Sequence, residues 1–323
     1  MKLASLKSKS NRDGDLCIVS RDLKSAVLAK SICPSMREAL EQWNEVAPKL
    51  EKLSKDLNSG NAQSSFTVKA DQFHSALPRT WLFADGSAFI HHIKLVRQAR
   101  KAALPETLLT VPLMYQAESG HFLAPTENIP PFDFAYGTDF EAEVGVIVDE
   151  VPIGTSAEES LKKIRLVVLI NDVSLRGLIP DELAAGFGFF QSKPAKALSP
   201  FALTIDELGE AWKEGRLHLP LQVQYNGQFF GKANAGAMHF HFGQLIAHAA
   251  RTRSLTAGSL IGSGTVANED PTVGSSCLAE KRTLETIHQG APKTPFMKSG
   301  DSIKIWMETP AGENLFGDIF QKI

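Results

Sequence analysis

The segment from Asp139 to Val148, with the sequence DFEAEVGVIV, constrains the fold more than any other part of this chain. Its β-branched and aromatic residues, together with the absence of Pro, predict a β-strand. Side chains two apart in a strand point to the same face, so Glu141 and Glu143 point the same way at one end of an apolar run. Two such carboxylates repel each other unless one is protonated or a cation lies between them. We therefore expect a bound cation here; the alternative is an edge strand with two solvated glutamates.

Composition narrows the class of protein. The chain has 323 residues, enough for one large domain and a smaller one, and its 43% hydrophobic and 22% charged residues are typical of soluble globular proteins. A net charge of -2 offers no electrostatic attraction to nucleic acid or to an anionic membrane. The N-terminus lacks the apolar core of a signal peptide, and no apolar run is long enough to span a membrane. The expected compartment is the cytoplasm.

Cysteine usage predicts no covalent framework. Cys17, Cys33 and Cys277 are odd in number and scattered, so neither a disulfide scaffold nor a thiolate zinc site is indicated. His239 and His241 are spaced as zinc ligands can be, but no Cys or carboxylate follows at ligand spacing. No Gly-x-Ser-x-Gly motif and no dinucleotide fingerprint occur, so serine-hydrolase and NAD chemistry lack support.

The chain divides into a small N-terminal domain, residues 1–75, and a larger one, residues 76–323. Short strands are expected up to about residue 35, where Ser35-Met36-Arg37-Glu38 matches a capping box. Helical periodicity then runs through Leu53, and the polar segment 57–65 is typical of a loop.

The larger domain is predicted to be mostly β. Strands are expected at residues 113–115, 139–148, 166–170, 219–225 and 302–307, with a hairpin turn at Asn226-Gly227. Helices are expected at residues 92–102, 156–164 and 242–253. Strands and helices do not alternate regularly, so the expected fold class is α+β, mostly β, rather than a doubly wound parallel sheet.

Two further acidic residues stand beside predicted core elements. Asp172 closes the apolar run 166–170, and Asp85 lies just before the helix expected from residue 92. An Asx-turn at Asp172 and a turn before the helix at Asp85 are the structural alternatives. Together with Glu141 and Glu143, these residues offer only carboxylate oxygens, a donor set that selects Mg²⁺ or Ca²⁺ over zinc or copper.

A histidine near Asp85 is a candidate general base. His92 follows Asp85 by seven residues and is expected to face inward on the first turns of its helix. The alternative, a histidine hydrogen-bonded to backbone, is our expectation for its neighbour His91. Glu280 could orient His92 or position a water; its alternative is an exposed strand residue beside Lys281 and Arg282. The Gly-rich segment 262–265 lacks the Lys of a P-loop, so it predicts a turn or a close approach of backbone to a ligand.

These motifs together resemble those of the fumarylacetoacetate hydrolase family in its two-domain bacterial form, over most of residues 80–320. Asp85 and His92 match the family's metal aspartate and catalytic histidine at equal spacing. The other matching motifs, in the family's order, are Glu141-Ala142-Glu143, Asn171-Asp172-Val173-Ser174-Leu175-Arg176, Gln191-Ser192-Lys193-Pro194 ahead of Ser199-Pro200, and Gly264-Thr265-Val266.

The resemblance implies a mixed β-sandwich and β-roll catalytic domain with a small α+β N-terminal domain. It also implies a role for ten residues: metal ligands Asp85, Glu141, Glu143 and Asp172; catalytic residues His92, Glu280 and Lys193; and substrate contacts Tyr115, Thr265 and, one residue out of register, Arg100. Mg²⁺ or Ca²⁺ is the implied cofactor, with Mn²⁺ also acceptable to oxygen ligands. A homodimer is implied as well.

The implied activity is hydrolysis of a carbon–carbon bond in a 1,3-diketo acid, fumarylacetoacetate or a related acylpyruvate, in the catabolism of tyrosine and other aromatic compounds. Two departures concern the substrate: residues 177–183 replace a segment that carries a Gln and a Tyr in the animal enzymes, and Ser87 replaces a substrate-contacting tyrosine. Hydration, decarboxylation or isomerisation of a 2-oxo acid is the alternative within enzymes. A structural Ca²⁺ site in a binding module is the alternative outside them, and it leaves His92, Lys193 and Glu280 without roles.

Overall fold

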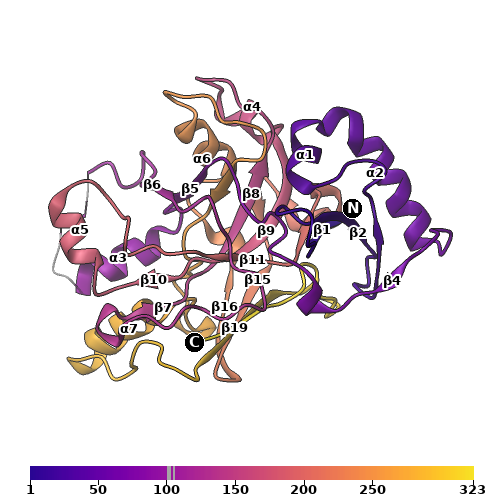
Figure 1. The fold of residues 1–323 in the computed structure, drawn as a ribbon. Coiled ribbons are helices and arrows are strands. Elements are labelled where there is room, and N and C mark those ends of the chain that lie inside the picture. Colours follow the sequence, from indigo (N-terminus) through magenta and orange to yellow (C-terminus); the bar gives the residue numbers. More distant parts are fainter. Residues whose placement is uncertain (100–102, 105) are drawn as a thin grey trace.

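The computed structural model describes residues 1–99, 103–104 and 106–323 (Figure 1). An eleven-stranded sheet forms its centre. In spatial order the sheet contains β4 (Phe66–Thr67), β3 (Ser25–Leu28), β2 (Asp15–Val19), β1 (Lys2–Leu6), β12 (Phe201–Leu203), β9 (Ile164–Asn171), β8 (Ala142–Val148), β17 (Leu260–Gly262), β5 (Phe83–Gly86) and β6 (Met114–Ala117), with β11 (Ala197–Leu198) also paired to β9.

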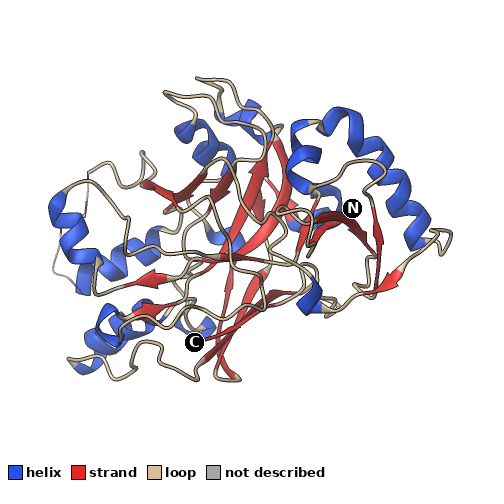
Figure 2. Ribbon diagram, in the orientation of Figure 1, coloured by secondary structure: helices blue, strands red, loops and turns tan. Residues whose placement is uncertain are grey.

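A second sheet of four strands packs nearby, and helices surround both sheets (Figure 2). Its order is β16 (Gln228–Asn234), β15 (Pro220–Tyr225), β18 (Ser302–Met307) and β19 (Ile319–Lys322). Two small ribbons pair β7 (Thr138–Asp139) with β10 (Ser174–Leu175) and β13 (Trp212–Lys213) with β14 (Arg216–Leu217). The α-helices are α1 (Met36–Glu41), α2 (Trp43–Asn58), α3 (Ile90–Ala99), α4 (Ala157–Leu161), α5 (Ile179–Ala185), α6 (Phe242–Ala249) and α7 (Leu278–Gln289).

Strand β8 lies at the middle of the main sheet, and all of its residues are buried. It pairs antiparallel with β9 on one side and with β17 on the other. Strand β17 in turn runs parallel to β5. This order brings the ends of β5, β8 and β9 to one region, although they are far apart in the sequence. The expectation of an α+β fold rich in strands is confirmed.

The N-terminal segment continues the main sheet, because β1 pairs with β12. Helices α1 and α2 cover this part of the sheet (Figure 1). Ser35 caps α1 by accepting from the Glu38 backbone N–H and donating to the Glu38 carboxylate, as a capping box requires. The single helix expected through Leu53 is wrong in one respect: Gln42, at φ -120 and ψ 27, separates α1 from α2. The boundary at residue 75 stays a prediction.

Several helix limits differ from those expected. Helix α3 begins at Ile90, and the expected end at residue 102 lies outside the described residues. Helices α4 and α6 are each shorter than the expected ranges 156–164 and 242–253. Helices α5 and α7 were not expected. Because Glu280 lies in α7 and is buried, the alternative that it is an exposed strand residue is wrong. The hairpin at Asn226-Gly227 is confirmed, with both residues at positive φ as a type I′ turn requires.

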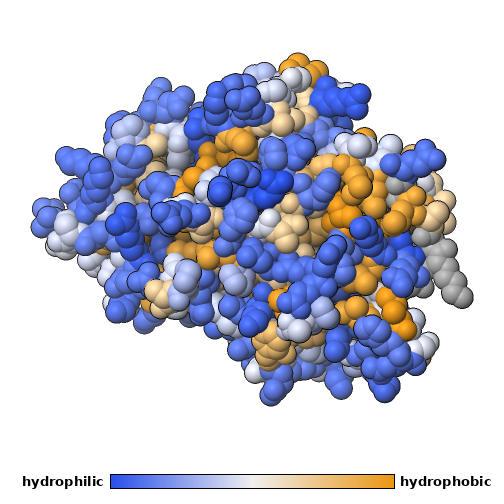
Figure 3. All heavy atoms as spheres, turned by 180° about the vertical axis from the view of Figure 1, so that it is seen from behind, coloured by the Kyte–Doolittle hydropathy of each residue, from blue (hydrophilic) through white to orange (hydrophobic). Residues whose placement is uncertain are grey.

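The surface seen from behind is largely hydrophilic, with separate apolar patches between the polar side chains (Figure 3). None of the described helices combines the length and the apolar character needed to cross a bilayer.

Candidate active site

Three carboxylates from three neighbouring strands meet inside the protein. Asp85 lies in β5, Glu143 in β8, and Asp172 directly after β9. One carboxylate oxygen from each lies within 4.8 Å of those from the other two, and all three residues are buried. Strand pairing explains the meeting, because β5, β17, β8 and β9 are successive neighbours in the sheet. We call these three residues the carboxylate cluster.

Within the carboxylate cluster, Glu143 lacks the partners that a buried charge requires. Neither oxygen of Glu143 has a hydrogen-bond partner among the described residues. Burial, and then the charge of Asp172, raises the pKa of Asp85 to about 8. Burial and the charges of Asp85 and Asp172 raise the pKa of Glu143 well above its usual value. An unpaired buried charge is costly, so without a cation the raised pKa values of Asp85 and Glu143 favour their protonated forms. Oxygen donors in this condition fit a hard divalent cation.

Glu141, the fourth expected ligand, is in a different situation. Its Oε1 accepts a hydrogen bond from Arg176 Nη2 at 2.5 Å, and its Oε2 accepts one from Lys193 Nζ at 2.8 Å. Burial alone would raise the pKa of Glu141, but Arg176 and Lys193 hold it well below its usual value. Glu141 is therefore an ion-paired carboxylate beside the carboxylate cluster.

Asp172 connects the cluster to the lysines. Its Oδ2 accepts from Lys193 Nζ at 2.5 Å and from the Tyr115 hydroxyl at 2.8 Å. Its Oδ1 lies 3.1 Å from Nζ of Lys196, a lysine with no exposed side-chain surface. Burial lowers the pKa of Lys193, but Asp172 and Glu141 outweigh this effect and raise it above its usual value. Lys193 thus keeps its positive charge inside the site.

The Gly-rich segment 262–265 lies against Asp85. A side chain at Gly262 would place its Cβ 2.1 Å from Asp85 Oδ1, so only glycine leaves room for this carboxylate. Gly264, at φ +76, donates its backbone N–H to the same oxygen at 3.3 Å. The close approach of backbone expected from these glycines is to a carboxylate of the site. Thr265 is buried in the same segment, and its contact with substrate stays a prediction.

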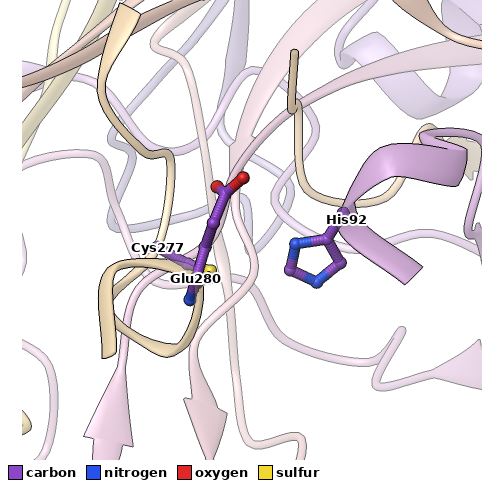
Figure 4. A group of neighbouring side chains, drawn as sticks. All are labelled: His92, Cys277 and Glu280. Carbon is purple, nitrogen blue, oxygen red and sulfur yellow. Dashed lines mark hydrogen bonds between the residues drawn. The ribbon is translucent and has the colours of Figure 1, made fainter. Parts of the chain in front are cut away.

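A second group of side chains gathers between α3 and α7 (Figure 4). His92, on the first turn of α3, faces Cys277, the N-cap of α7, and Glu280, in the first turn of α7. Each offers a potential ligand atom within 4.8 Å of the other two. Burial lowers the pKa of His92 to about 4 and raises that of Glu280 to about 7. The imidazole is therefore neutral near pH 7 and can accept a proton.

The pairing of His92 with Glu280 stays a prediction. His92 Nδ1 has no hydrogen-bond partner in the part of the chain that the structure describes. Glu280 Oε2 instead accepts from the Ser276 backbone N–H at 3.3 Å. Hydrogen bonds between catalytic groups are often long in the absence of substrate and shorten in the complex.

Four further residues that the sequence singled out have the following places in the structure. Tyr115 lies against Asp172 and Lys193, while Arg100 lies outside the described residues. His239 Nε2 lies 3.0 Å from the Leu109 carbonyl oxygen, and His241 is the N-cap residue of α6.

Sequence reasoning assigned no role to four side chains of the site: the buried Asp139, Lys196 and Cys277, and Arg176, whose side chain is 13% exposed. Arg176 donates to Asp139 and to Glu141, and Asp139 also accepts the backbone N–H groups of Leu278 and Ala279 at the start of α7. Arg176 ends the motif Asn171-Asp172-Val173-Ser174-Leu175-Arg176, so the sequence did contain a signal that could have marked it as a site residue. Lys196 follows Lys193 by three residues, and nothing in the sequence separates it from a surface lysine.

Comparison with known proteins supports the resemblance. Residues 82–319 match the domain described as "Fumarylacetoacetate (FAA) hydrolase C-terminal", and residues 1–79 match "Fumarylacetoacetase N-terminal domain 2". The chain is 26% identical over 203 residues to 2,4-didehydro-3-deoxy-L-rhamnonate hydrolase of Sphingomonas sp. (strain SKA58), covering 62% of each protein. It is 26% identical over 215 residues to fumarylacetoacetase of Caenorhabditis elegans, covering 58% of this chain and 51% of that one. The chain thus spans between half and two thirds of the length of these curated relatives.

Solved structures share the fold over the whole chain. Maleylpyruvate hydrolase from Sphingobium sp. SYK-6 has a TM-score of 0.66 at 14% identity, and 5-carboxymethyl-2-hydroxymuconate delta-isomerase from Mycobacterium smegmatis has 0.60 at 16%. Both matches cover 100% of this chain and 98% of the other. At such low identity they show the fold alone. Because the C-terminal domain match by itself extends over most of the sequence, the chain belongs to the fumarylacetoacetate hydrolase family.

Proposed function

We propose that this protein is a metal-dependent hydrolase that cleaves a carbon–carbon bond in a 1,3-diketo acid, fumarylacetoacetate or a related acylpyruvate. The observation that supports this most is the carboxylate cluster: three buried carboxylates whose oxygens lie within 4.8 Å of one another, close to a charged lysine, with both oxygens of Glu143 unpaired among the described residues. A cluster of this kind is suited to binding a cation and, through it, a chelating substrate.

The cation would be held by Asp85, Glu143 and Asp172, with Glu141 beside them as the fourth proposed ligand. Mg²⁺ or Ca²⁺ suits these oxygens, and so does Mn²⁺. When bound, such an ion acts as a Lewis acid that polarises a carbonyl. The maleylpyruvate hydrolase from Sphingobium sp. SYK-6, which shares the fold, was crystallised with manganese(II) ion and pyruvate.

The side chains of the protein supply the proton transfer and the charge stabilisation. His92, neutral near pH 7, would take a proton from water, and Glu280 would hold the imidazole in the useful tautomer. Lys193, held positive by Asp172 and Glu141, would stabilise negative charge on the departing carbon acid. Tyr115, Thr265 and Arg100 are the proposed substrate contacts.

Hydration, decarboxylation or isomerisation of a 2-oxo acid is the second candidate. It is favoured by the pKa of Glu280, which burial raises to about 7, because a carboxyl group of this acidity can both accept and return a proton near neutral pH.

The proposal also includes the compartment and the assembly: a cytoplasmic homodimer whose chain has domains at residues 1–75 and 76–323. Phe187 and Phe190, which are large exposed apolar side chains, are candidates for burial by a second copy.

A substrate panel tests the reaction. Purified protein would be assayed with fumarylacetoacetate, acylpyruvates, oxaloacetate and 2-oxo-pentenoates, with Mg²⁺ and with EDTA. We expect hydrolysis of a diketo acid that EDTA abolishes. Activity that persists after exhaustive EDTA treatment would refute the metal-dependent mechanism. Conversion of 2-oxo-pentenoates or oxaloacetate alone would favour the second candidate.

Substitution of His92 tests the general base. His92→Ala is expected to lower turnover by roughly 10²–10⁴-fold, the usual contribution of a general base, and to leave Mg²⁺ affinity nearly unchanged. His91→Ala is the matched control, because His91 is its half-buried neighbour on the same helix. Comparable turnover in both variants would exclude His92 as the base. If the cation site were only structural, the unaltered protein would have no activity, and neither substitution could lower it.

A further inference from the structure

The second group, His92, Cys277 and Glu280, has a different donor set from the carboxylate cluster. It combines an imidazole nitrogen, a thiol sulfur and a carboxylate oxygen, each within 4.8 Å of the others. Figure 4 shows the imidazole ring facing the start of α7, where the other two side chains originate. Cys277 is fully buried and has no part in the proposed reaction.

The hydrogen bonds of these three residues leave electron pairs free for a ligand. His92 Nδ1 is buried and has no hydrogen-bond partner among the described residues. Cys277 Sγ accepts one bond, from the Glu280 backbone N–H at 3.3 Å. Glu280 accepts one at Oε2, from the Ser276 backbone N–H. A buried, unpartnered ring nitrogen beside a thiol and a carboxylate is the local arrangement that a metal ion would satisfy.

The donor set selects the kind of ion. Nitrogen and sulfur ligands favour Zn²⁺ or Co²⁺ over Mg²⁺ and Ca²⁺, which take oxygen ligands. Tetrahedral zinc, with bonds of about 2.0–2.3 Å, holds its ligand atoms roughly 3.3–3.6 Å apart. Because the three donors lie within 4.8 Å of one another, they would have to move closer by at most about 1.5 Å, which rotation of the His92 and Glu280 side chains can supply. A water would complete the coordination, and the thiol proton would pass to solvent as the ion binds.

We infer that His92, Cys277 and Glu280 form a second metal site, selective for Zn²⁺ and similar borderline-soft ions, and that its occupation inhibits the enzyme. An ion bound to the imidazole occupies the electron pair with which His92 would accept a proton. The inhibition rests on the proposed function, in which His92 is the base. The binding of the ion does not rest on it.

Cobalt binding tests the site without reference to activity. Mg²⁺-saturated protein would be titrated with Co²⁺, which gives a near-ultraviolet charge-transfer band when a thiolate coordinates it. We expect the band in the unaltered protein and in Cys33→Ser, a control at a buried thiol elsewhere, and its loss in Cys277→Ser. Ser is a favoured N-cap and can still accept the Glu280 N–H, so Cys277→Ser preserves the start of α7.

Zinc affinity, measured by competition with a chromophoric chelator, gives the size of the effect. Cys277→Ser is expected to weaken Zn²⁺ binding by about 100-fold or more, since losing even an outer partner of a ligand costs roughly 10–100-fold. A cobalt band of equal strength in Cys277→Ser, or no band in the unaltered protein, would overturn the site.

Zinc inhibition tests the consequence. The rate of each variant with Zn²⁺ is divided by its own rate without Zn²⁺, so that changes in basal activity cancel. We expect strong inhibition of the unaltered protein and of Cys33→Ser at a zinc concentration that leaves the Cys277→Ser ratio near one. Equal inhibition of Cys277→Ser would mean that zinc acts at the carboxylate cluster, against this inference. If no variant has activity, the proposed function fails, and the cobalt band still decides whether the second site exists.

Discussion

Glu141 and Glu143 stand two residues apart but have opposite surroundings. Glu141 accepts from Arg176 and Lys193 and keeps its charge. Both oxygens of Glu143 lack a partner among the described residues, and its pKa is well above the usual value because it is buried beside Asp85 and Asp172. Similar sequence neighbourhoods therefore produce one satisfied and one unsatisfied carboxylate.

The difference shows which part of the site is stable by itself. The Glu141 side is a network in which Arg176 joins Asp139 to Glu141, and Asp139 also receives two backbone N–H groups from α7. It needs no ion to balance its charges. Asp85 and Glu143, in contrast, are balanced only when protons or a cation are present. The network thus balances its charges without the proposed cation, whereas Glu143 does not.

Removing the charge of Glu141 is the strongest test of this contrast. Glu141→Gln leaves Arg176 and Lys193 buried with less opposing charge, and breaking a buried ion pair from one side typically costs about 3–5 kcal/mol. We expect that loss in the free energy of unfolding, measured by urea denaturation in the presence of EDTA. Glu51→Gln, on the exposed side of α2, is the control, with a change expected within about 0.5 kcal/mol. Equal stability of the two variants would contradict the proposed importance of the network.

Replacing Arg176 by lysine tests whether the geometry of the network matters in addition to its charge. Arg176 donates to Asp139 and to Glu141 through two separate nitrogens, a fork that a single ammonium group does not reproduce. Arg176→Lys is therefore expected to cost about 2 kcal/mol in the free energy of unfolding, the value of one hydrogen bond to a charged group. A neutral effect would show that positive charge alone suffices at this position.

Glu143→Gln should have the opposite sign when metal is absent. The substitution removes a buried carboxylate that has no partner, so with EDTA at pH 8 we expect the variant to be more stable by about 1–2 kcal/mol. With Mg²⁺ the order should reverse, because the unaltered protein gains stability by binding the ion and the variant gains much less. Thermal unfolding with EDTA and with Mg²⁺ measures both. Equal stabilisation of the two proteins by Mg²⁺ would exclude Glu143 as a ligand.

The sequence predicted the part of the site that depends on strand alternation. A period of two places Glu143 on a known face of β8, and the apolar run 166–170 places Asp172 at the end of β9. Residues in a pleated strand have little freedom in direction, so a pattern in the sequence determines where their side chains point. Asp85 was a candidate for a different reason, because no strand was expected at β5 and its role came from the family motif that it shares with His92.

The parts that the sequence did not predict depend on helix ends and on distant partners. Helix α7 is capped by Cys277, and α5 follows Leu178 without a side-chain cap, so neither helix shows the Ser, Thr, Asp or Asn that marks a beginning. The pairing of Lys196 with Asp172 joins β9 to a segment after α5 by tertiary contact, which leaves no local pattern. Opposite charges recur throughout the chain, and spacing does not say which of them meet.

A paired carboxylate outside the site provides the smallest and most specific test. Asp13 accepts from Arg79 at 2.6 Å and from Arg37 at 3.1 Å. Burial opposes ionisation, but these two arginines lower the pKa of Asp13 below its usual value. The unfolded chain therefore takes up this proton at a higher pH than the folded protein does. The stabilising contribution of Asp13 is complete above about pH 5 and is lost as the pH falls through 3.9, the usual Asp value, toward the folded pKa.

Asp13→Asn should remove this dependence. Because the arginines are partly exposed, the pairs are expected to contribute roughly 1 kcal/mol to the free energy of unfolding at neutral pH. The difference between the unaltered protein and Asp13→Asn should therefore be near that value at pH 6 and shrink toward zero at pH 3, whereas Asp71→Asn, at an exposed position, shows no such change. Asp85 and Glu143 predict the reverse slope with EDTA, because a pKa that is raised on folding makes the folded protein more stable as the pH falls and less stable as it rises. If the stability difference between the unaltered protein and Asp13→Asn instead grew as the pH fell, pairing with arginine would not explain why Asp13 and Glu143 differ in pKa.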